Sequence, residues 1–315
     1  MNSPIYSSVY GRTTSEATNI VARVHRQASS RVILYAIARV ITSTRQRRVG
    51  WQVSISHGVK AEIELDGVGM TFSHSNRQVT ALSNINLTIP QNEIVCLLGP
   101  SGCGKSTLLR LMTDLLQPTS GSIKIEGLEP QKARLARKLG IIFQTPTLFD
   151  WRTARGNVEL PLEILGIGKR ARRQTAGELL ELVGLQQFAN YFPWQLSGGM
   201  QQRVAIARAL SLDPAILFMD EPFSALDEFT KEKLHVEVLN IREKTGKTIV
   251  FVTHSIPEAV FLSDRIVVLS AHPGRVKEII PVNLAARMDA DVRESSEFFD
   301  YVRRVRHCFQ QEGEL

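Results

Sequence analysis

Cysteine is scarce in this sequence. The 315 residues contain only Cys96, Cys103 and Cys308. Their spacing fits neither a disulfide framework nor a metal-binding motif. We therefore expect a protein of a reducing compartment that carries no structural disulfide.

Long apolar runs are also missing. The longest run near the start of the chain covers residues 32–38, and Arg39 interrupts it after seven residues. A helix that crosses a bilayer needs about 20 such residues. The sequence thus predicts no membrane-spanning helix, and any work at a membrane would go through a partner protein.

Acidic residues are nearly absent from residues 1–57, which hold eight arginines and a single acid, Glu16. The net charge of +7 therefore lies in this segment, and its basic character says nothing about nucleic-acid binding by the rest of the chain. Its composition predicts disorder or loose helix. Three interpretations stay open: a start site set too far upstream, an arginine-rich targeting peptide and a secretory signal.

From about residue 61 the pattern becomes one of alternating strands and helices, without an internal repeat. Short apolar runs predict strands at 94–98, 139–143, 216–219, 247–252, 265–269 and 276–280. Further strand is expected around Ile63 and Leu65 and at 82–89 and 121–125. Helices are expected at 108–116, 158–165, 170–183, 201–210, 229–244 and 257–262. This alternation implies an α/β fold with a mostly parallel sheet.

The most specific motif lies between a predicted strand and a predicted helix. Residues 99–107 read G-P-S-G-C-G-K-S-T and match the spacing G-x-x-x-x-G-K-[ST] of a phosphate-binding loop. The glycines let backbone N–H groups point into one hollow, and the helix start adds its positive dipole end. Lys105 can reach the β- and γ-phosphates, and the Ser106 hydroxyl can ligate Mg²⁺.

Two acids follow the apolar strand at 216–219. They stand at the carboxyl end of a buried strand, which is where open α/β sheets bind ligands. Asp220 suits holding Mg²⁺, directly or through water. Glu221 suits accepting a proton from an attacking water.

A second glycine-rich motif, L-S-G-G-M-Q-Q-R, occupies residues 196–203 just before a predicted helix. Ser197, Gly198 and Gly199 at a helix start make a second anion site. A chain with two phosphate sites and one nucleotide suggests that the second site serves another copy of the chain.

Taken in order, these motifs resemble the ATP-binding subunit of an ABC transporter. The resemblance covers about residues 61–280. It implies a P-loop NTPase core of mostly parallel sheet, an antiparallel β subdomain and an inserted α-helical subdomain. We divide the chain into a basic leader at 1–57, an ABC ATPase domain at 58–283 with its helical subdomain at about 145–210, and a helical tail at 284–315.

The resemblance also assigns roles to residues. Phe72 would stack on adenine, Gln144 would complete the Mg²⁺ shell, and His254 would contact the γ-phosphate. Asp227 would support the site of a partner copy. The implied catalytic residues are Glu221, His254, Lys105 and Gln144. The implied nucleotide-binding residues are Phe72, Gly99, Pro100, Ser101, Gly102, Cys103, Gly104, Lys105, Ser106, Thr107, Ser197, Gly198, Gly199, Gln201 and Asp227. The implied Mg²⁺ ligands are Ser106, Gln144 and Asp220.

The partners follow from the same resemblance. Two ATP molecules would lie between two head-to-tail copies of the chain, each held by the phosphate loop of one copy and the second glycine motif of the other. Transmembrane permease subunits would be direct partners, and a periplasmic or lipoprotein binding protein an indirect one. The chain would then be a peripheral protein at the cytoplasmic face of the cell membrane, with no nucleic-acid partner.

Four segments, at 148–153, 157–162, 259–265 and 269–275, are similar to the nitrate, sulfonate and taurine importer ATPases, which serve small anionic nutrients. Related members take thiamine precursors, so the substrate stays open. Ser255 stands where this class usually has Asp, and Trp194 where it usually has His. Since neither residue belongs to the phosphate-handling motifs, these departures bear on the substrate and not on ATPase activity.

The segment after Gln144 forms, in this family, a groove for a short permease helix. We expect Phe149 and Trp151 to face that partner; the alternative is that Trp151 packs inside the helical subdomain. A second function class also stays open, a soluble ABC ATPase that acts on nucleic acid or ribosomes. Against it, only about 90 residues separate Lys105 from Ser197, too few for the long coiled coil of repair-type members, and the chain has one ATPase unit.

Overall fold

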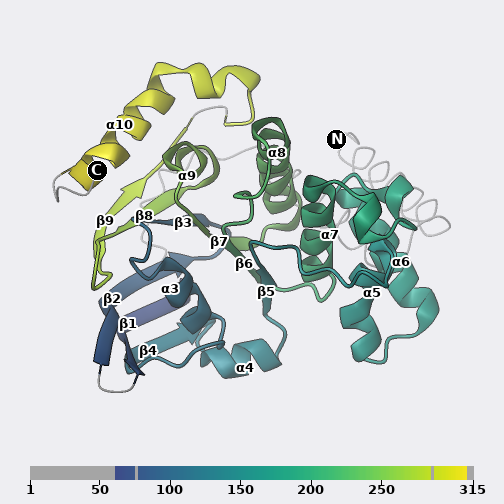
Figure 1. Cartoon of the computed structure of the whole chain (residues 1–315), viewed down its shortest axis with the longest axis horizontal. Coiled ribbons are helices and arrows are strands. Elements are labelled where there is room, and N and C mark those ends of the chain that lie inside the picture. Colours follow the sequence, from purple (N-terminus) through teal and green to yellow (C-terminus); the bar gives the residue numbers. More distant parts are fainter. Residues whose placement is uncertain (1–60, 75–76, 285–286, 311–315) are drawn as a thin grey trace, which may run out of the picture. The chain divides into compact units, whose positions relative to one another are not determined.

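The computed structural model describes residues 61–74, 77–284 and 287–310 (Figure 1). The predicted leader at 1–57 lies outside these residues. In the part of the chain that is described, no helix is both long and apolar enough to cross a membrane.

A six-stranded sheet organises this region, with the strand order β5-β6-β7-β3-β8-β9. Its strands are β3 (Ile94–Leu98), β5 (Leu139–Ile142), β6 (Ile216–Asp220), β7 (Thr248–Thr253), β8 (Arg265–Leu269) and β9 (Val276–Pro281). Five of them are parallel, and β9 runs antiparallel to β8. Parallel neighbours need crossover connections, which are usually helical. The carboxyl ends of the central strands therefore share one edge of the sheet.

Both faces of this sheet are covered, as the apolar run of β3 requires. Every residue of β3 is buried, and its side chains alternate between two cores. Val95 and Leu97 enter a core shared with α3 (Lys105–Met112) and a second sheet. Ile94, Cys96 and Leu98 enter the other core, which the remaining large helices cover.

The second sheet is antiparallel and has the order β2-β1-β4. Its strands are β1 (Ala61–His74), β2 (Arg77–Pro90) and β4 (Ser120–Ile125). Ile63 and Leu65 are buried in the core that also holds Val95, whereas Glu64 between them is exposed. This alternation confirms the half-buried strand expected there.

Three helices pack on one another beside the large sheet: α5 (Ala154–Ile164), α6 (Lys169–Leu182) and α7 (Gly198–Leu210). They stand together in Figure 1. The buried side chain of Asn157 organises the loop before α5. It accepts a hydrogen bond from Phe149 N at 2.8 Å and donates to the carbonyls of Phe149, Arg152 and Thr153. The loop is therefore held rigidly on the helical group.

The remaining helices complete the described chain. They are α4 (Pro130–Leu135), α8 (Glu228–Thr245), α9 (Ile256–Leu262) and α10 (Ser296–Gln310), with the short 3-10 helices η1 (Gln186–Phe188), η2 (Pro193–Gln195) and η3 (Ala290–Glu294). The predicted fold class, an α/β P-loop NTPase core with a mostly parallel sheet, is confirmed. Helix α3 differs from the expected 108–116. It begins at Lys105, directly from the phosphate loop, and ends at Met112, before Asp114 turns with a positive φ.

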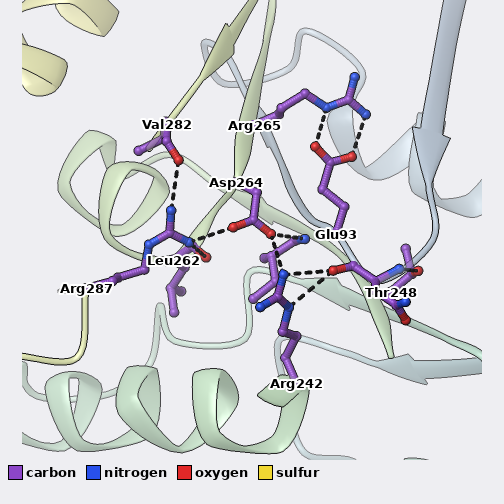
Figure 2. A network of polar contacts seen from close by, with 10 residues as sticks. Glu93, Arg242, Thr248, Leu262, Asp264, Arg265, Val282 and Arg287 are labelled. Carbon is purple, nitrogen blue, oxygen red and sulfur yellow. Dashed lines mark hydrogen bonds and ion pairs between the residues drawn. The ribbon is translucent and has the colours of Figure 1, made fainter. Parts of the chain in front are cut away.

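A polar cluster at the amino ends of β3 and β8 joins these strands to the C-terminal segment (Figure 2). The Asp264 carboxylate accepts hydrogen bonds from Ile94 N at 2.9 Å, from Arg242 at 3.3 Å and from Arg287 at 3.1 Å. Next to it, Arg265 donates twice to the Glu93 carboxylate, at 2.5 and 2.7 Å. One carboxylate thus connects β3, α8 and the chain beyond β9.

Arg287 is the C-terminal member of this cluster. It also donates to the carbonyls of Leu262 and Val282, at 3.1 and 3.0 Å. Its burial lowers the pKa of the guanidinium, and the Asp264 charge opposes that shift. A buried guanidinium needs such partners because an unpaired buried charge is costly.

Replacing Asp264 by Ala should lower the free energy of unfolding by about 2–3 kcal/mol, because the change leaves Ile94 N–H and two arginines without their shared acceptor. Urea denaturation measures this difference. Asp300→Ala is a matched control, since Asp300 and its ion-pair partner Arg303 are both largely exposed and should contribute less than about 1 kcal/mol. Equal losses in the two variants would contradict a special role for the Asp264 cluster.

Candidate nucleotide-binding site

The phosphate loop connects β3 to α3 at the edge of the large sheet. Gly104 has φ +99° and Gly102 has φ +79°, conformations that favour glycine. At Gly104 a Cβ would lie 2.7 Å from the Leu82 side chain and 3.0 Å from Ala81 O. Strand β2 therefore lies against the loop so closely that no other residue fits there without movement.

Lys105 is buried at the start of α3. Its Nζ donates to Gly99 O at 2.7 Å and to Pro100 O at 2.8 Å. The Cys103 thiol is 3.8 Å from the same nitrogen. Burial raises the pKa of Cys103, although the Lys105 charge opposes the shift, so the thiol remains protonated. The ammonium is thus held by two backbone carbonyls of the phosphate loop itself.

Ser106 and Asp220 are brought together across two elements. Ser106 Oγ donates to Asp220 Oδ1 at 2.8 Å. Hydroxyl and carboxylate oxygens are ligands that Mg²⁺ prefers, and Mg²⁺ is commonly held by one or two protein oxygens plus substrate phosphates. The pair fits the Mg²⁺ site expected from the sequence.

Glu221, the predicted proton acceptor, and His254, the predicted γ-phosphate contact, also lie together. His254 Nδ1 is 3.5 Å from Glu221 Oε2. Glu221 has φ +45°, and its N–H donates to Val252 O in the neighbouring strand. His254 follows β7 and is 61% exposed in its side chain. The sheet register therefore presents a carboxylate and an imidazole side by side at the same edge as the phosphate loop.

Lys105, Ser106 and Glu221 line one cavity of about 450 Å³, whereas Asp220 and His254 are not among its lining residues. Its lining residues are Phe72, Val79, Ala81, Ser101, Gly102, Gly104, Lys105, Ser106, Thr107, Glu221 and His272. Phe72, the residue predicted to stack on adenine, lines this cavity and is 41% exposed. Val79, Ala81 and His272 were not expected from the sequence. They reach the site from the start of β2 and from the loop after β8. The sequence marked residues 269–275 only for their similarity to the importer class and not as part of the site.

The second glycine motif is built as a helix start. Ser197 caps α7, accepting a hydrogen bond from Met200 N at 3.3 Å. The Gln201 side chain donates to Pro193 O and Leu196 O, which fixes the residues in front of the helix. Gly199 has no room for a Cβ, which would lie 2.3 Å from Thr230 Cγ2. None of the described residues from Ser197 to Gln201 lines the cavity, so the structure does not bring this motif to the chain's own phosphate loop.

Gln144 and Asp227 lie near a connecting residue, Ser224. Gln144 Nε2 donates to Ser224 Oγ at 2.9 Å, and that hydroxyl donates to Glu221 O at 3.1 Å. Asp227 caps α8 by accepting from Thr230 N at 3.0 Å, and hydrogen bonds from Thr230 lower its pKa. Gln144 is thus linked through Ser224 to Glu221, directly after β6. Within the described chain it forms no hydrogen bond with Ser106, the predicted Mg²⁺ ligand of the phosphate loop.

Comparisons with known proteins agree with this geometry. The family model described as "ABC transporter" matches residues 82–224. An uncharacterized ABC transporter ATP-binding protein of Methanocaldococcus jannaschii is 45% identical over 254 residues, which is 81% of this chain and 93% of that protein. The chain belongs to the ABC transporter ATP-binding family. As a member of this family it is an ATPase, and the suspected importer class is supported by the relatives that follow.

Two import proteins are similar to this ABC ATPase. A nitrate import ATP-binding protein of Synechocystis is 41% identical over 245 residues, covering 76% of this chain and 91% of the relative. A taurine import ATP-binding protein of Yersinia pestis is 45% identical over 207 residues, covering 66% and 80%.

Two solved structures of ATP-binding cassettes have folds similar to that of this ABC ATPase. A dimeric post-hydrolysis state of an ATP-binding cassette bound to ADP and phosphate has a TM-score of 0.63 at 38% identity, and the match covers 70% of this chain and 99% of that one. A second dimeric structure, of a bacterial ABC transporter cassette, has a TM-score of 0.62 at 38% identity, with the same coverage.

Replacing Glu221 by Gln should reduce kcat for ATP hydrolysis by at least about 100-fold, because the amide cannot accept the proton of the attacking water. The affinity for ATP should stay within a few-fold of the wild-type value. Phosphate release and equilibrium titration measure the two quantities. Lys105→Ala serves as the contrast, since it should lose binding as well as turnover. Full hydrolysis by the Glu221→Gln protein would overturn the assignment of this carboxylate.

Proposed function

We propose that this ABC ATPase is the ATP-hydrolysing subunit of an importer that takes up a small anionic nutrient of the nitrate, sulfonate or taurine type through a separate permease. The observation that carries the proposal is the similarity to the nitrate and taurine import proteins over most of their length. The cavity supports the ATPase part of the proposal, because residues of the phosphate loop and Glu221 line the same space. The chain would work as a peripheral protein at the cytoplasmic face of the membrane.

In the proposed reaction, Phe72 stacks on the adenine and the phosphate loop holds the phosphates through its N–H groups. Lys105 moves from the carbonyls of Gly99 and Pro100 to the β- and γ-phosphate oxygens. Ser106 and Asp220 would hold Mg²⁺, which neutralises charge on the phosphates when bound. Glu221 accepts the proton of the attacking water, and His254, 3.5 Å away, orients that carboxylate and contacts the γ-phosphate.

The second glycine motif serves a partner copy in this proposal. Its helix start at Ser197 is built for an anion, yet these residues do not line the cavity of their own chain. Both solved relatives are described as dimeric. Two head-to-tail copies would place Ser197, Gly198, Gly199 and Gln201 of each on the nucleotide of the other, with Asp227 beside them.

The Glu221→Gln protein also tests this arrangement. With ATP bound and hydrolysis blocked, it should accumulate as a dimer of twice the chain mass in light scattering, whereas Lys105→Ala should stay monomeric. A Glu221→Gln protein that binds ATP and remains a monomer would contradict the shared site.

The permease would dock on the loop after Gln144. Phe149 and Trp151 pack against each other with ring centroids 4.9 Å apart, and Trp151 is nonetheless 73% exposed. The loop that carries them is fixed by Asn157. An exposed aromatic pair on a rigid loop is a suitable anchor for a partner, because little conformational entropy is lost on binding.

Trp151→Ala should abolish co-purification with the permease and leave the midpoint of thermal unfolding within about 1 °C, since most of the side chain contacts no other part of the described chain. Basal ATPase activity of the free subunit should be unchanged. Phe299→Ala is a matched control, an exposed aromatic on α10 that should affect neither property. A folding defect in Trp151→Ala would show instead that the ring belongs to the helical core.

An uptake assay tests the transport function itself. Cells that lack this chain are supplied in turn with nitrate, taurine, an alkanesulfonate or a thiamine precursor as the sole source of the relevant nutrient. They should fail to grow on one of these, and that one names the substrate. Growth should return with the wild-type gene and not with Glu221→Gln. Normal growth of the deletion strain on every one of these would contradict this substrate class and favour an ATPase that acts outside transport.

A further inference from the structure

The loop after β8 carries a motif whose role has not been explained. Residues 269–275 read L-S-A-H-P-G-R. The loop is closed by its own hydrogen bonds, from Ser270 N to Arg275 O at 3.0 Å and from Arg275 N to Ser270 Oγ at 3.1 Å. It is therefore a defined turn between β8 and β9.

This turn is fastened to the nucleotide site by Gly274. Gly274 N donates to Ala81 O at 2.9 Å, and Ser83 N donates to Gly274 O at 3.0 Å. A Cβ on Gly274 would lie only 2.1 Å from Cys103 O in the phosphate loop. The backbone of Gly274 thus holds the turn against both β2 and the phosphate loop, without help from the side chain of its neighbour His272.

His272 extends from the same turn into the lining of the cavity. Its Nε2 is 3.4 Å from the position that a Cβ on Gly102 would take, so the imidazole lies beside the glycine-rich tip of the phosphate loop. Among the described residues, no protein group forms a hydrogen bond with this ring, and the side chain is exposed. An imidazole placed at a phosphate-binding loop with its polar atoms unused is suited to a ligand, not to bracing the fold.

We propose that His272 binds the phosphate chain of the bound nucleotide, with Nε2–H donating to a phosphate oxygen beside Gly102. The proposal rests on the nucleotide site proposed above. Phe72 offers a ring for the base, whereas His272 lies beside Gly102 in the phosphate loop and lines the same cavity as Lys105. An imidazole N–H is a good donor to an anionic oxygen, and charge-assisted bonds of this kind are shorter and stronger than neutral ones.

Three substitutions at His272 separate a hydrogen bond from other roles. His272→Ala removes the ring, and His272→Phe keeps a ring without a donor. His272→Gln keeps an N–H close to the position of Nε2. Arg275→Ala is the control for the turn, because Arg275 is exposed on the same turn and is not among the described residues that line the cavity.

The measurement is the Kd for ADP and for ATP, taken by calorimetry on the full chain, together with KM and kcat for ATP. His272→Ala and His272→Phe should weaken both nucleotides about tenfold, which is the usual effect of losing a charge-assisted hydrogen bond. KM should rise while kcat changes less than about twofold. His272→Gln should stay within about threefold of the wild type, and Arg275→Ala should be unchanged.

Each other outcome overturns the inference in a distinct way. Unchanged affinity in His272→Ala would mean that the ring does not touch the nucleotide. Normal binding by His272→Phe with weak binding by His272→Gln would mean that the ring packs and does not donate. A common loss in all variants including Arg275→Ala, with a lowered unfolding midpoint, would mean that the turn braces the loop.

Lys105→Ala, measured in parallel, separates this inference from the function on which it rests. If Lys105→Ala also binds nucleotide normally, the proposed phosphate site itself fails. If Lys105→Ala loses binding and the His272 variants do not, the phosphate site stands and only the role of His272 is wrong.

Discussion

The hydrogen-bonded register of β6, β7 and β3 is the constraint on which the site depends. Leu98 pairs with Thr253, and Asp220 pairs with Val252, so the three strands end almost level. Parallel strands hold their carboxyl ends at one edge, and a phosphate loop, a pair of acids and a histidine follow these ends directly. A shift of one residue in this register would turn buried side chains to the opposite core and separate the catalytic groups.

The same sheet explains how a charged site stands beside an apolar core. Side chains of β3 alternate into two cores and all five are buried. The phosphate loop and its polar groups begin only after Leu98, the last residue of this strand. Lys105 is buried there and is satisfied by the carbonyls of Gly99 and Pro100. At the amino ends of the strands, Asp264 accepts hydrogen bonds from Ile94 N and from the side chains of Arg242 and Arg287. These bonds connect the C-terminal segment to the start of β3.

Much of the fold and of the nucleotide site could be predicted from the sequence, because strands and phosphate-binding motifs leave patterns in short stretches of residues. The bounds of β3 and the fold class are confirmed, and the predicted acids and histidine meet at one edge since each directly follows a buried strand. His272, Val79 and Ala81 were missed because they come to the cavity from parts of the chain that are distant in sequence from the phosphate loop. The cluster at Asp264 was missed for the same reason, as its members are distant in sequence. For Trp151 the sequence left two alternatives, an exposed ring and a packed one. The structure has the ring 73% exposed, on a loop that Asn157 holds through contacts between residues 149 and 157.

The orientation of α7 has a kinetic consequence. The residues at its start do not line the cavity of the same chain, so in the proposed dimer each active site is completed by another molecule. Turnover per free subunit would then follow mass action and increase with protein concentration, as it does for any enzyme that assembles from dilute parts. On a permease that binds two copies, the local concentration is set by geometry instead. ATP hydrolysis would then depend on assembly at the membrane, and free subunits in solution would hydrolyse little ATP.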